Sequence, residues 1–170
     1  NITIDDITLD ATGNTATASI DNISAFASED ATANITIDDI TLIADGNTAT
    51  ASIDNISAYA VTGTTATATA TIDIGNIELT ANADVGAATA SIGNILADAS
   101  VSSTSGSATA NITIDDITLD ATGNTATASI DNIDADANAS SSGAATATAT
   151  ANITIDDITL IADGNTATAS

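Results

Sequence analysis

Apolar and polar residues alternate along most of this chain, and the alternation changes phase at regular points. Ala16, Ala18 and Ile20 occupy every second position, and Ile23 and Ala25 do so again with the opposite parity. The two residues between Ile20 and Ile23 absorb the shift, so the apolar side chains on both sides can face one interior. Period-two alternation is strand periodicity, and Thr and Ile favour strands. The pattern predicts an all-β protein of about eighteen short strands, each of roughly 5–7 residues.

The phase change is always an Ile-x-x-Ile step with two small polar residues inside it. The step recurs at intervals of 16 to 25 residues, and each step marks one half-repeat. We therefore expect a single continuous repeat array over residues 1–170. Because the chain begins without Met and stops within a repeat at Ser170, we also expect it to be a window of a longer chain. The half-repeats are centred near residues 4–7, 20–23, 37–40, 53–56, 74–77, 92–95, 114–117, 130–133 and 155–158.

Longer blocks of sequence repeat with few or no substitutions. Residues 1–23 and 111–133 both read NITIDDITLDATGNTATASIDNI, and near copies begin at Asn34 and Asn152. A fixed repeat of this length is typical of architectures in which each unit packs mainly on its neighbours. A Gly-Asn turn closes one end of the block, where we expect glycine to supply a positive φ. The variable segments that begin at Ser28, Val61, Ser102 and Ser140 are predicted to be loops that project from the body.

Two architectures satisfy this pattern. In a β-solenoid, each half-repeat forms one rung of strand, arc and strand, and like residues stack at the strand spacing of about 4.8 Å. Asn22, Asn55 and Asn132 would then contribute to ladders of side-chain amides. In the alternative, an antiparallel β-meander, the steps are two-residue hairpin turns and the apolar face packs against partner sheets. Exact repetition and the poor fit of Asp-Asp to a hairpin turn favour the solenoid.

The charge of the chain is all of one sign. Its 170 residues include 23 acidic side chains and no Lys, Arg, His, Cys, Met, Trp or Pro. Internal salt bridges, disulfides and the usual phosphate contacts of nucleic-acid binding are therefore excluded. No apolar run approaches the ~18 residues of a membrane span. Because His, Cys and Lys are missing, no Ser/His/Asp or Cys/His arrangement can be assembled, and we do not expect an enzyme.

The aspartates at the steps are the candidate metal ligands. Hard cations prefer oxygen ligands, and stacked rungs would align Asp6, Asp21, Asp39 and Asp54 along one edge. The alternative is that these residues are solvated turn formers. A catalytic carboxylate pair needs unlike environments, which repeated turns do not provide. No cofactor is required, and Ca²⁺ is the cation that we consider. The candidate ligands are Asp5, Asp6, Asp21, Asp38, Asp39, Asp54, Asp115, Asp116, Asp131, Asp156 and Asp157.

Threonine and asparagine supply two further patterns. TATAS segments begin at Thr15, Thr48, Thr125 and Thr166, and a TATATATI segment begins at Thr65, which places Thr at alternate outward positions. Such flat Thr-x-Thr arrays resemble the ice-contacting faces of some antifreeze solenoids, although Asn34, Asp120 and Asp134 interrupt the array. Asn-x-Ser/Thr sequons are possible glycan sites in a secreted chain. They lie at Asn1, Asn22, Asn34, Asn55, Asn111, Asn138 and Asn152.

These patterns predict a structural protein at the cell surface or outside the cell. The leading hypothesis is a β-rich fibre or surface-layer filament that self-associates by stacking of repeats. The first alternative is a calcium-stiffened spacer of a large surface adhesin, and the second is an ice-binding solenoid. The expected partners are further copies of the chain, with divalent cations or glycans as additional ligands, and neither nucleic acid nor a membrane span.

Overall fold

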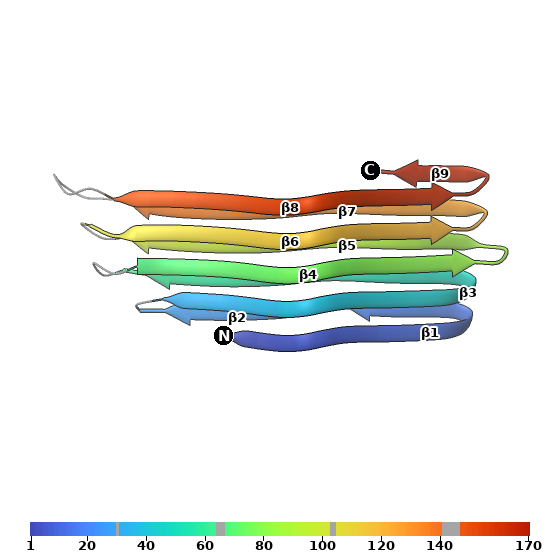
Figure 1. The fold of residues 1–170 in the computed structure, drawn as a ribbon, viewed down its shortest axis with the longest axis horizontal. Helices are drawn as coiled ribbons and strands as arrows, with labels where there is room; N and C mark the ends of the chain where they lie inside the picture. Colours follow the sequence, from blue (N-terminus) through green and yellow to red (C-terminus); the bar gives the residue numbers. More distant parts are fainter. Residues whose placement is uncertain (30, 64–66, 103–104, 141–146) are drawn as a thin grey trace.

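The computed structural model describes residues 1–29, 31–63, 67–102, 105–140 and 147–170, and the regular structure in these ranges is β-strand (Figure 1). Parts of the predicted loops that begin at Ser28, Val61, Ser102 and Ser140 lie outside the described residues, as does Thr65. The nine strands are β1 (Ile2–Ile20), β2 (Ile23–Ser28), β3 (Thr32–Thr62), β4 (Thr67–Ala83), β5 (Ala87–Ser102), β6 (Ser107–Thr122), β7 (Thr125–Ser140), β8 (Thr148–Asp163) and β9 (Thr166–Ala169).

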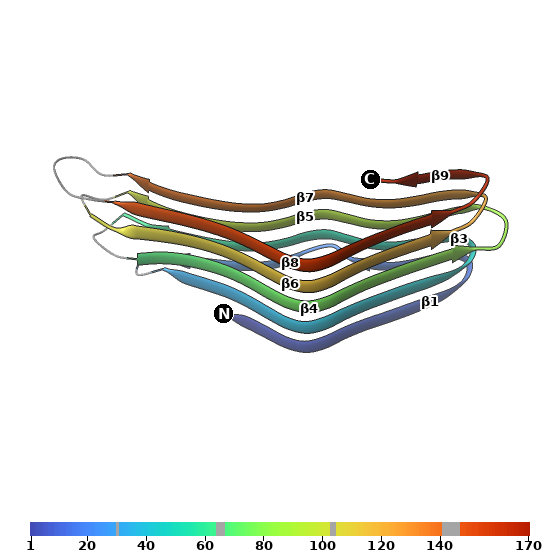
Figure 2. The ribbon, with the colours of Figure 1, turned by 45° about the horizontal axis from the view of Figure 1, so that its top comes forward.

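The strands form two facing sheets in which all the pairings are parallel. Sheet A contains β1 up to Gly13, β3 up to Gly46, and then β4, β6 and β8. Sheet B contains β1 from Thr15, β3 from Thr48, and then β2, β5, β7 and β9. One sheet A strand and the sheet B strand that follows it make one coil, and the coils stack along the molecule (Figures 1 and 2). The predicted β-solenoid is confirmed, and the parallel pairing rules out the meander.

The unit that stacks is a whole repeat. Ile2 pairs with Ile35, Ile35 with Ile72 and Ile72 with Ile112, and paired residues throughout the molecule are 33 to 41 positions apart. The expectation that one half-repeat makes a complete rung of short strands is therefore wrong. A half-repeat is one strand, 16 or 17 residues long in β4 to β8, that crosses one sheet.

The Ile-x-x-Ile step bends a strand without reversing it. Figure 2 shows this bend midway along β4, β6 and β8. At the step of β3, Asp38 and Asp39 both point outward, so Ile37 and Ile40 both point inward despite their opposite parity. Pairing continues through the bend, because Asp6 still lies opposite Asp39. The chain reverses instead at the Gly-Asn turns and at the variable loops.

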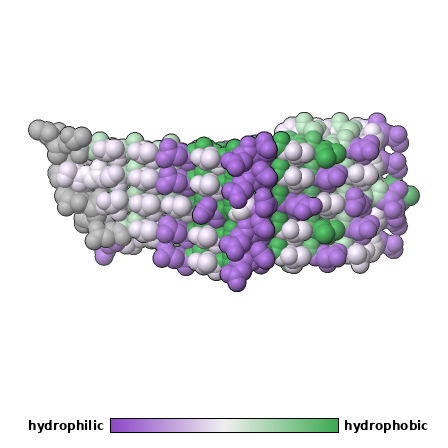
Figure 3. Space-filling model, in the orientation of Figure 1, coloured by the Kyte–Doolittle hydropathy of each residue, from purple (hydrophilic) through white to green (hydrophobic). Residues whose placement is uncertain are grey.

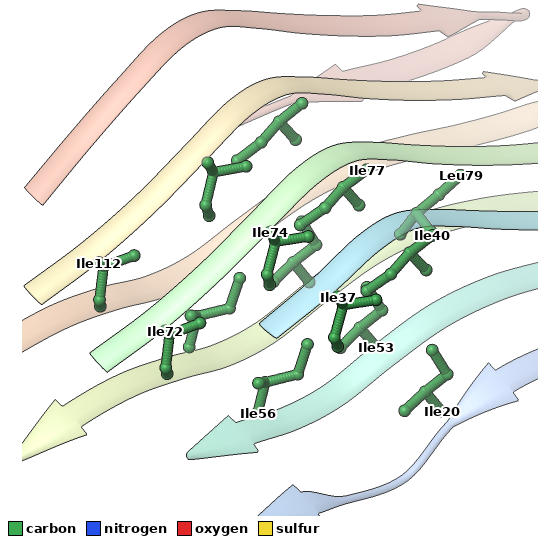
Figure 4. Close-up of a cluster of buried hydrophobic side chains, with 14 of the residues drawn as sticks. Ile20, Ile37, Ile40, Ile53, Ile56, Ile72, Ile74, Ile77, Leu79 and Ile112 are labelled. Carbon is green, nitrogen blue, oxygen red and sulfur yellow. The ribbon is translucent and has the colours of Figure 1, made fainter. Parts of the chain in front are cut away.

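The core is a thin layer of Ile, Leu and Ala between the two sheets. Ile37, Ile40, Ile53 and Ile56 are at most 1% exposed and meet from opposite sheets (Figure 4). Alanine fills the core toward both ends of the coil. Because an Ala side chain buries little area, and burial is worth roughly 25 cal/mol per Å², we infer that continuous backbone ladders carry much of the stability.

Glycine has two different roles at the Gly-Asn turns. Gly13 has a φ of 144°, as expected for a position that favours glycine. At Gly46 and Gly164 the reason is close approach: an added Cβ would collide with the carbonyl oxygen of Gly13 and of Gly123, respectively. The turns therefore stack so tightly that a side chain cannot be accommodated at these two positions.

Candidate functional site

The step divides the outer surface of each sheet into two panels, one before the step and one after it. Figure 3 shows the outer face of sheet A, where a hydrophilic band crosses the middle of the molecule. A depression of about 600 Å³ on this face is lined by Thr71, Asp73, Asn111 and neighbouring residues, and Asp73 is the one ionisable side chain among them. An acid and base pair is therefore not assembled there. That the chain is not an enzyme stays a prediction.

The candidate metal ligands lie on two opposite edges. On sheet A, Asp6 pairs with Asp39 and Asp116 pairs with Asp157. Asp21 and Asp54 lie at the steps of sheet B, so the expected single edge containing Asp6, Asp21, Asp39 and Asp54 is wrong. The reason is that consecutive half-repeats alternate between the sheets. The sheet A edge holds Asp5, Asp6, Asp38, Asp39, Asp115, Asp116, Asp156 and Asp157, and the sheet B edge holds Asp21, Asp54 and Asp131.

These rows do not by themselves form a metal centre. In the described part of the chain, no three or more acidic side chains are grouped in a way that could hold an ion. The carboxylates point outward along a bend, where water and mobile cations reach them. Calcium binding therefore stays a prediction that requires a titration.

One step interrupts the rows of aspartates on sheet A. In β4 the step reads Gly75-Asn76, and Asn76 lies opposite Asp39. The backbone N–H and the side-chain amide of Asn76 donate hydrogen bonds of 2.8 and 3.0 Å to Oδ1 of Asp39. A Cβ at Gly75 would collide with the carbonyl oxygen of Asp38, so a second aspartate does not fit this local backbone. The step thus places a hydrogen-bond donor between two pairs of like charges.

A ladder of side-chain amides runs along the steps of sheet B. Asn55 donates to Asn22 at 2.7 Å, Asn94 to Asn55 at 2.9 Å, and Asn132 to Asn94 at 2.9 Å. The predicted contribution of Asn22, Asn55 and Asn132 to an amide ladder is confirmed. The sequence analysis did not predict that Asn94 belongs to the ladder. Asn94 nevertheless holds the same position in its Ile-x-x-Ile step as Asn22, Asn55 and Asn132 hold in theirs.

A second, interrupted set of amide contacts lies at the Gly-Asn turns. Asn47 donates to Asn14 at 3.2 Å, and Asn165 donates to Asn124 at 3.3 Å. The third turn has no Asn at this position, and Asn124 donates instead to the carbonyl oxygen of Val85 at 2.7 Å. Sequence reasoning missed these contacts. The signal that would have found them is the Asn that follows the turn glycine in the other four turns.

The sequons occupy unlike environments. The Nδ2 atom that would carry a glycan donates to Asn22 and Ser57 in Asn55, and to Asn111 in Asn152. Asn34 is half-buried, and its Oδ1 is buried without a hydrogen-bond partner among the described residues. Asn1 and Asn138 are exposed. Asn22 is exposed as well, and none of these three side chains donates a hydrogen bond among the described residues. Glycosylation itself stays a prediction.

The threonine pattern divides between the sheets. The TATAS segments lie on sheet B before the step, whereas Thr67, Thr69 and Thr71 of the TATATATI segment lie on sheet A. Of the interrupting residues, Asn34 and Asp120 lie on sheet A. Asp134 lies on sheet B, but after the step, opposite Leu96. The residues that interrupt the threonine array in the sequence therefore belong to other panels.

An acidic cluster lies on sheet B after the step. Asp98 is half-buried and pairs with Asp136, beside the exposed Asp134. Burial raises the pKa of Asp98 above the ordinary value of 3.8, and the negative charges of Asp136 and Asp134 raise it further. This carboxylate is held in an environment that disfavours its ionised form.

Comparison with known proteins does not assign the chain to a family. Among the residues that the structure describes, no helix is long and apolar enough to cross a membrane. No protein-family model, curated protein or solved structure matches this chain.

Proposed function

We propose that this chain is an extracellular structural protein whose coils stack into a β-rich fibre or surface-layer filament. The observation that supports the proposal most directly is the register. Each coil pairs with the next position by position, so that Ile2 lies on Ile35 and Ile112 lies on Ile153. The repeat at Asn1 and the repeat at Asn152 share the segment NITIDDITL. The last coil therefore presents the same row of residues that the first coil presents.

The last coil also presents a surface suited to a further coil. Ile153 and Ile158 of β8 are 46% and 51% exposed, whereas the stacked Ile112 and Ile117 of β6 are each 1% exposed. An open strand edge offers unpaired N–H and C=O groups to another strand. Covering these isoleucines with a further coil, from this chain or from another, would remove apolar surface from water and extend the hydrogen-bond ladder.

The charge of the outer surface favours end-to-end stacking over side-by-side contact. All 23 charged side chains are acidic, and the Asp rows described above face outward. A surface whose charged side chains are all negative disfavours contact between charged panels of neighbouring columns. End-to-end stacking, in which apolar rows meet, is then the favoured contact.

The test compares two substitutions on β8. Ile158→Asp places a charge in the inward row that a further coil would cover. Ile161→Asp is the matched control, because Ile161 points outward and its partner in β6 is already an aspartate, Asp120. Electron microscopy and sedimentation velocity on the 170-residue chain, from low to high concentration, should show filaments for the parent chain and for Ile161→Asp only.

Discrete monomers of the parent chain at high concentration and high salt would contradict the proposal. Equal assembly of Ile158→Asp and the parent chain would show that β8 is not the stacking surface. Circular dichroism checks that both variants keep the strand content of the parent chain.

A further inference from the structure

One outer panel of sheet B is a two-dimensional array of hydroxyl groups. We name the panel before the step the hydroxyl panel. It has three columns of five residues. Each column takes one residue from β1, β3, β5 and β7 and one from β9 or from Ser170, which follows it. Ala87 is the one of these positions without a hydroxyl. The columns are Thr15, Thr48, Ala87, Thr125 and Thr166; Thr17, Thr50, Thr89, Thr127 and Thr168; and Ser19, Ser52, Ser91, Ser129 and Ser170.

The hydroxyl panel carries no charge, although the chain has a net charge of −23. All fifteen of its positions are described, and none is Asp or Glu. Each of the other three outer panels contains a carboxylate. Asp73 lies on sheet A before the step, Glu78 on sheet A after the step, and Asp98 on sheet B after the step. The missing charge is therefore a property of this panel and not of the outer surface in general.

The hydroxyl groups of the panel are not used by the protein. In the described residues, no side-chain hydrogen bond joins any of them to another group, whereas Ser57, further along sheet B, donates to Ser24 at 3.2 Å. The backbone beneath the panel is held by the parallel ladder through Ala16, Ala49 and Ala88. The panel is thus a regular array, held on a continuous backbone ladder, of hydroxyl groups that can each donate one hydrogen bond and accept two.

We propose that the hydroxyl panel binds ice. Along a strand the outward hydroxyls repeat at roughly 6.5 Å, and between coils they repeat at about 4.8 Å. Water molecules in ice also donate and accept hydrogen bonds from fixed rows, with repeats of the same order. An array held on one backbone ladder can meet many of them at once, and the backbone ordering has already been achieved by folding. Charged groups would favour liquid hydration instead, and this panel has none.

The alternative flat ligands fit less well. A crystalline polysaccharide presents sugar rings, for which aromatic side chains provide the usual stacking surface. The two aromatic residues, Phe26 and Tyr59, lie opposite each other on sheet B after the step. A mineral surface with divalent cations requires carboxylates, which lie on the other panels. The inference is independent of filament formation, because a single column presents the complete panel.

The experiment compares one substitution on two panels. Thr89→Tyr places a ring that projects from the centre of the hydroxyl panel, between Thr50 and Thr127. Thr109→Tyr is the matched control on sheet A, where Thr109 is also half-buried and lies between Thr69 and Thr150. Tyrosine is favoured in strands, so both variants should fold, which circular dichroism checks. The readouts are thermal hysteresis and the fraction of protein taken into slowly grown ice.

The parent chain and Thr109→Tyr should both enter ice and show thermal hysteresis. Thr89→Tyr should lose roughly tenfold or more in ice affinity, because a projecting ring separates the neighbouring hydroxyls from the crystal. Exclusion of the parent chain from ice would overturn the proposal, as would an equal loss in both variants. Binding to crystalline cellulose or chitin without uptake into ice would overturn it in favour of a polysaccharide ligand.

Discussion

The side-chain amide and the backbone N–H of Asn76 both donate hydrogen bonds to Oδ1 of Asp39, at 3.0 and 2.8 Å. This contact joins two consecutive coils at the one sheet A step that has no aspartate. The carboxylates of Asp6 and Asp39 lie on one side of it, and those of Asp116 and Asp157 lie on the other. Asn76 therefore relieves part of the repulsion that stacking like charges creates.

Replacing this donor with a carboxylate should destabilise the solenoid. Asn76→Asp removes the side-chain donor and places five carboxylates in one row, so we expect the free energy of unfolding to fall by about 1–2 kcal/mol at low salt. Denaturant unfolding at low and high salt measures the change, and salt should recover part of the loss. Asn138→Asp, which adds the same charge at an exposed position of β7, is the control. An equal loss in both variants would mean that net charge, and not this hydrogen bond, is responsible.

The amide ladder predicts a graded series. Asn94 donates to Asn55 and accepts from Asn132, whereas Asn132 takes part in one ladder hydrogen bond. We expect Asn94→Ala to lower the free energy of unfolding by about 1–2 kcal/mol and Asn132→Ala to lower it by about half as much. Thermal and denaturant unfolding measure both. A loss at Asn94 no larger than that at Asn132 would argue against a cooperative ladder.

Asp98 predicts a pH-dependent stabilisation. Burial and the charges of Asp136 and Asp134 raise its pKa in the folded state, so the folded chain retains this proton at pH values where the unfolded chain has released it. The contribution of Asp98 to stability is therefore complete below the ordinary pKa of 3.8 and is lost as pH rises through the folded-state pKa. Asp98→Asn removes this loss, and the variant should be more stable than the parent chain near neutral pH.

The control for that comparison removes one charge elsewhere. Asp163→Asn, at the last residue of β8, takes away the same charge from a different part of the surface. Thermal melts from strongly acidic to about neutral pH should show the Asp98→Asn advantage growing with pH. A stabilisation that is independent of pH, or equal in both variants, would contradict the assignment to Asp98.

We expect calcium to stabilise the fold more than a monovalent salt of equal ionic strength, which only screens the carboxylate charges. The pairs Asp38-Asp39 and Asp115-Asp116 lie on the sheet A edge, where a divalent cation would relieve repulsion between coils. Bound calcium should raise Tm by about 2–4 °C for each kcal/mol of binding free energy. Calorimetry in CaCl₂ and in NaCl of equal ionic strength separates binding from screening, and Asp115→Asn with Asp116→Asn should reduce the calcium effect. Equal Tm values in CaCl₂ and in NaCl would contradict the prediction that calcium binds to the folded chain.

The amino-acid sequence by itself determined the properties that depend on neighbouring residues. The period of two predicted strands, and the parity change at each step correctly predicted that Ile37 and Ile40 both point inward. Exact repetition predicted parallel stacking of like on like, and with it an amide ladder to which Asn22 and Asn55 contribute. The strands and the inward isoleucines follow from the alternating geometry of a strand, which is local, whereas the stacking was inferred from the repetition of the sequence.

The tertiary structure alone decided which repeats meet. A step that reverses the chain and a step that only bends it satisfy the same local pattern, and the choice between them depends on pairing between residues 33 to 41 positions apart. That choice placed Asp6 on Asp39 and not beside Asp21. It also placed Asn34, Asp120 and Asp134, which interrupt the threonine pattern in the sequence, on panels other than the hydroxyl panel. Pairing over such distances is decided by the packing of the whole column, because each coil is stable only on its neighbours.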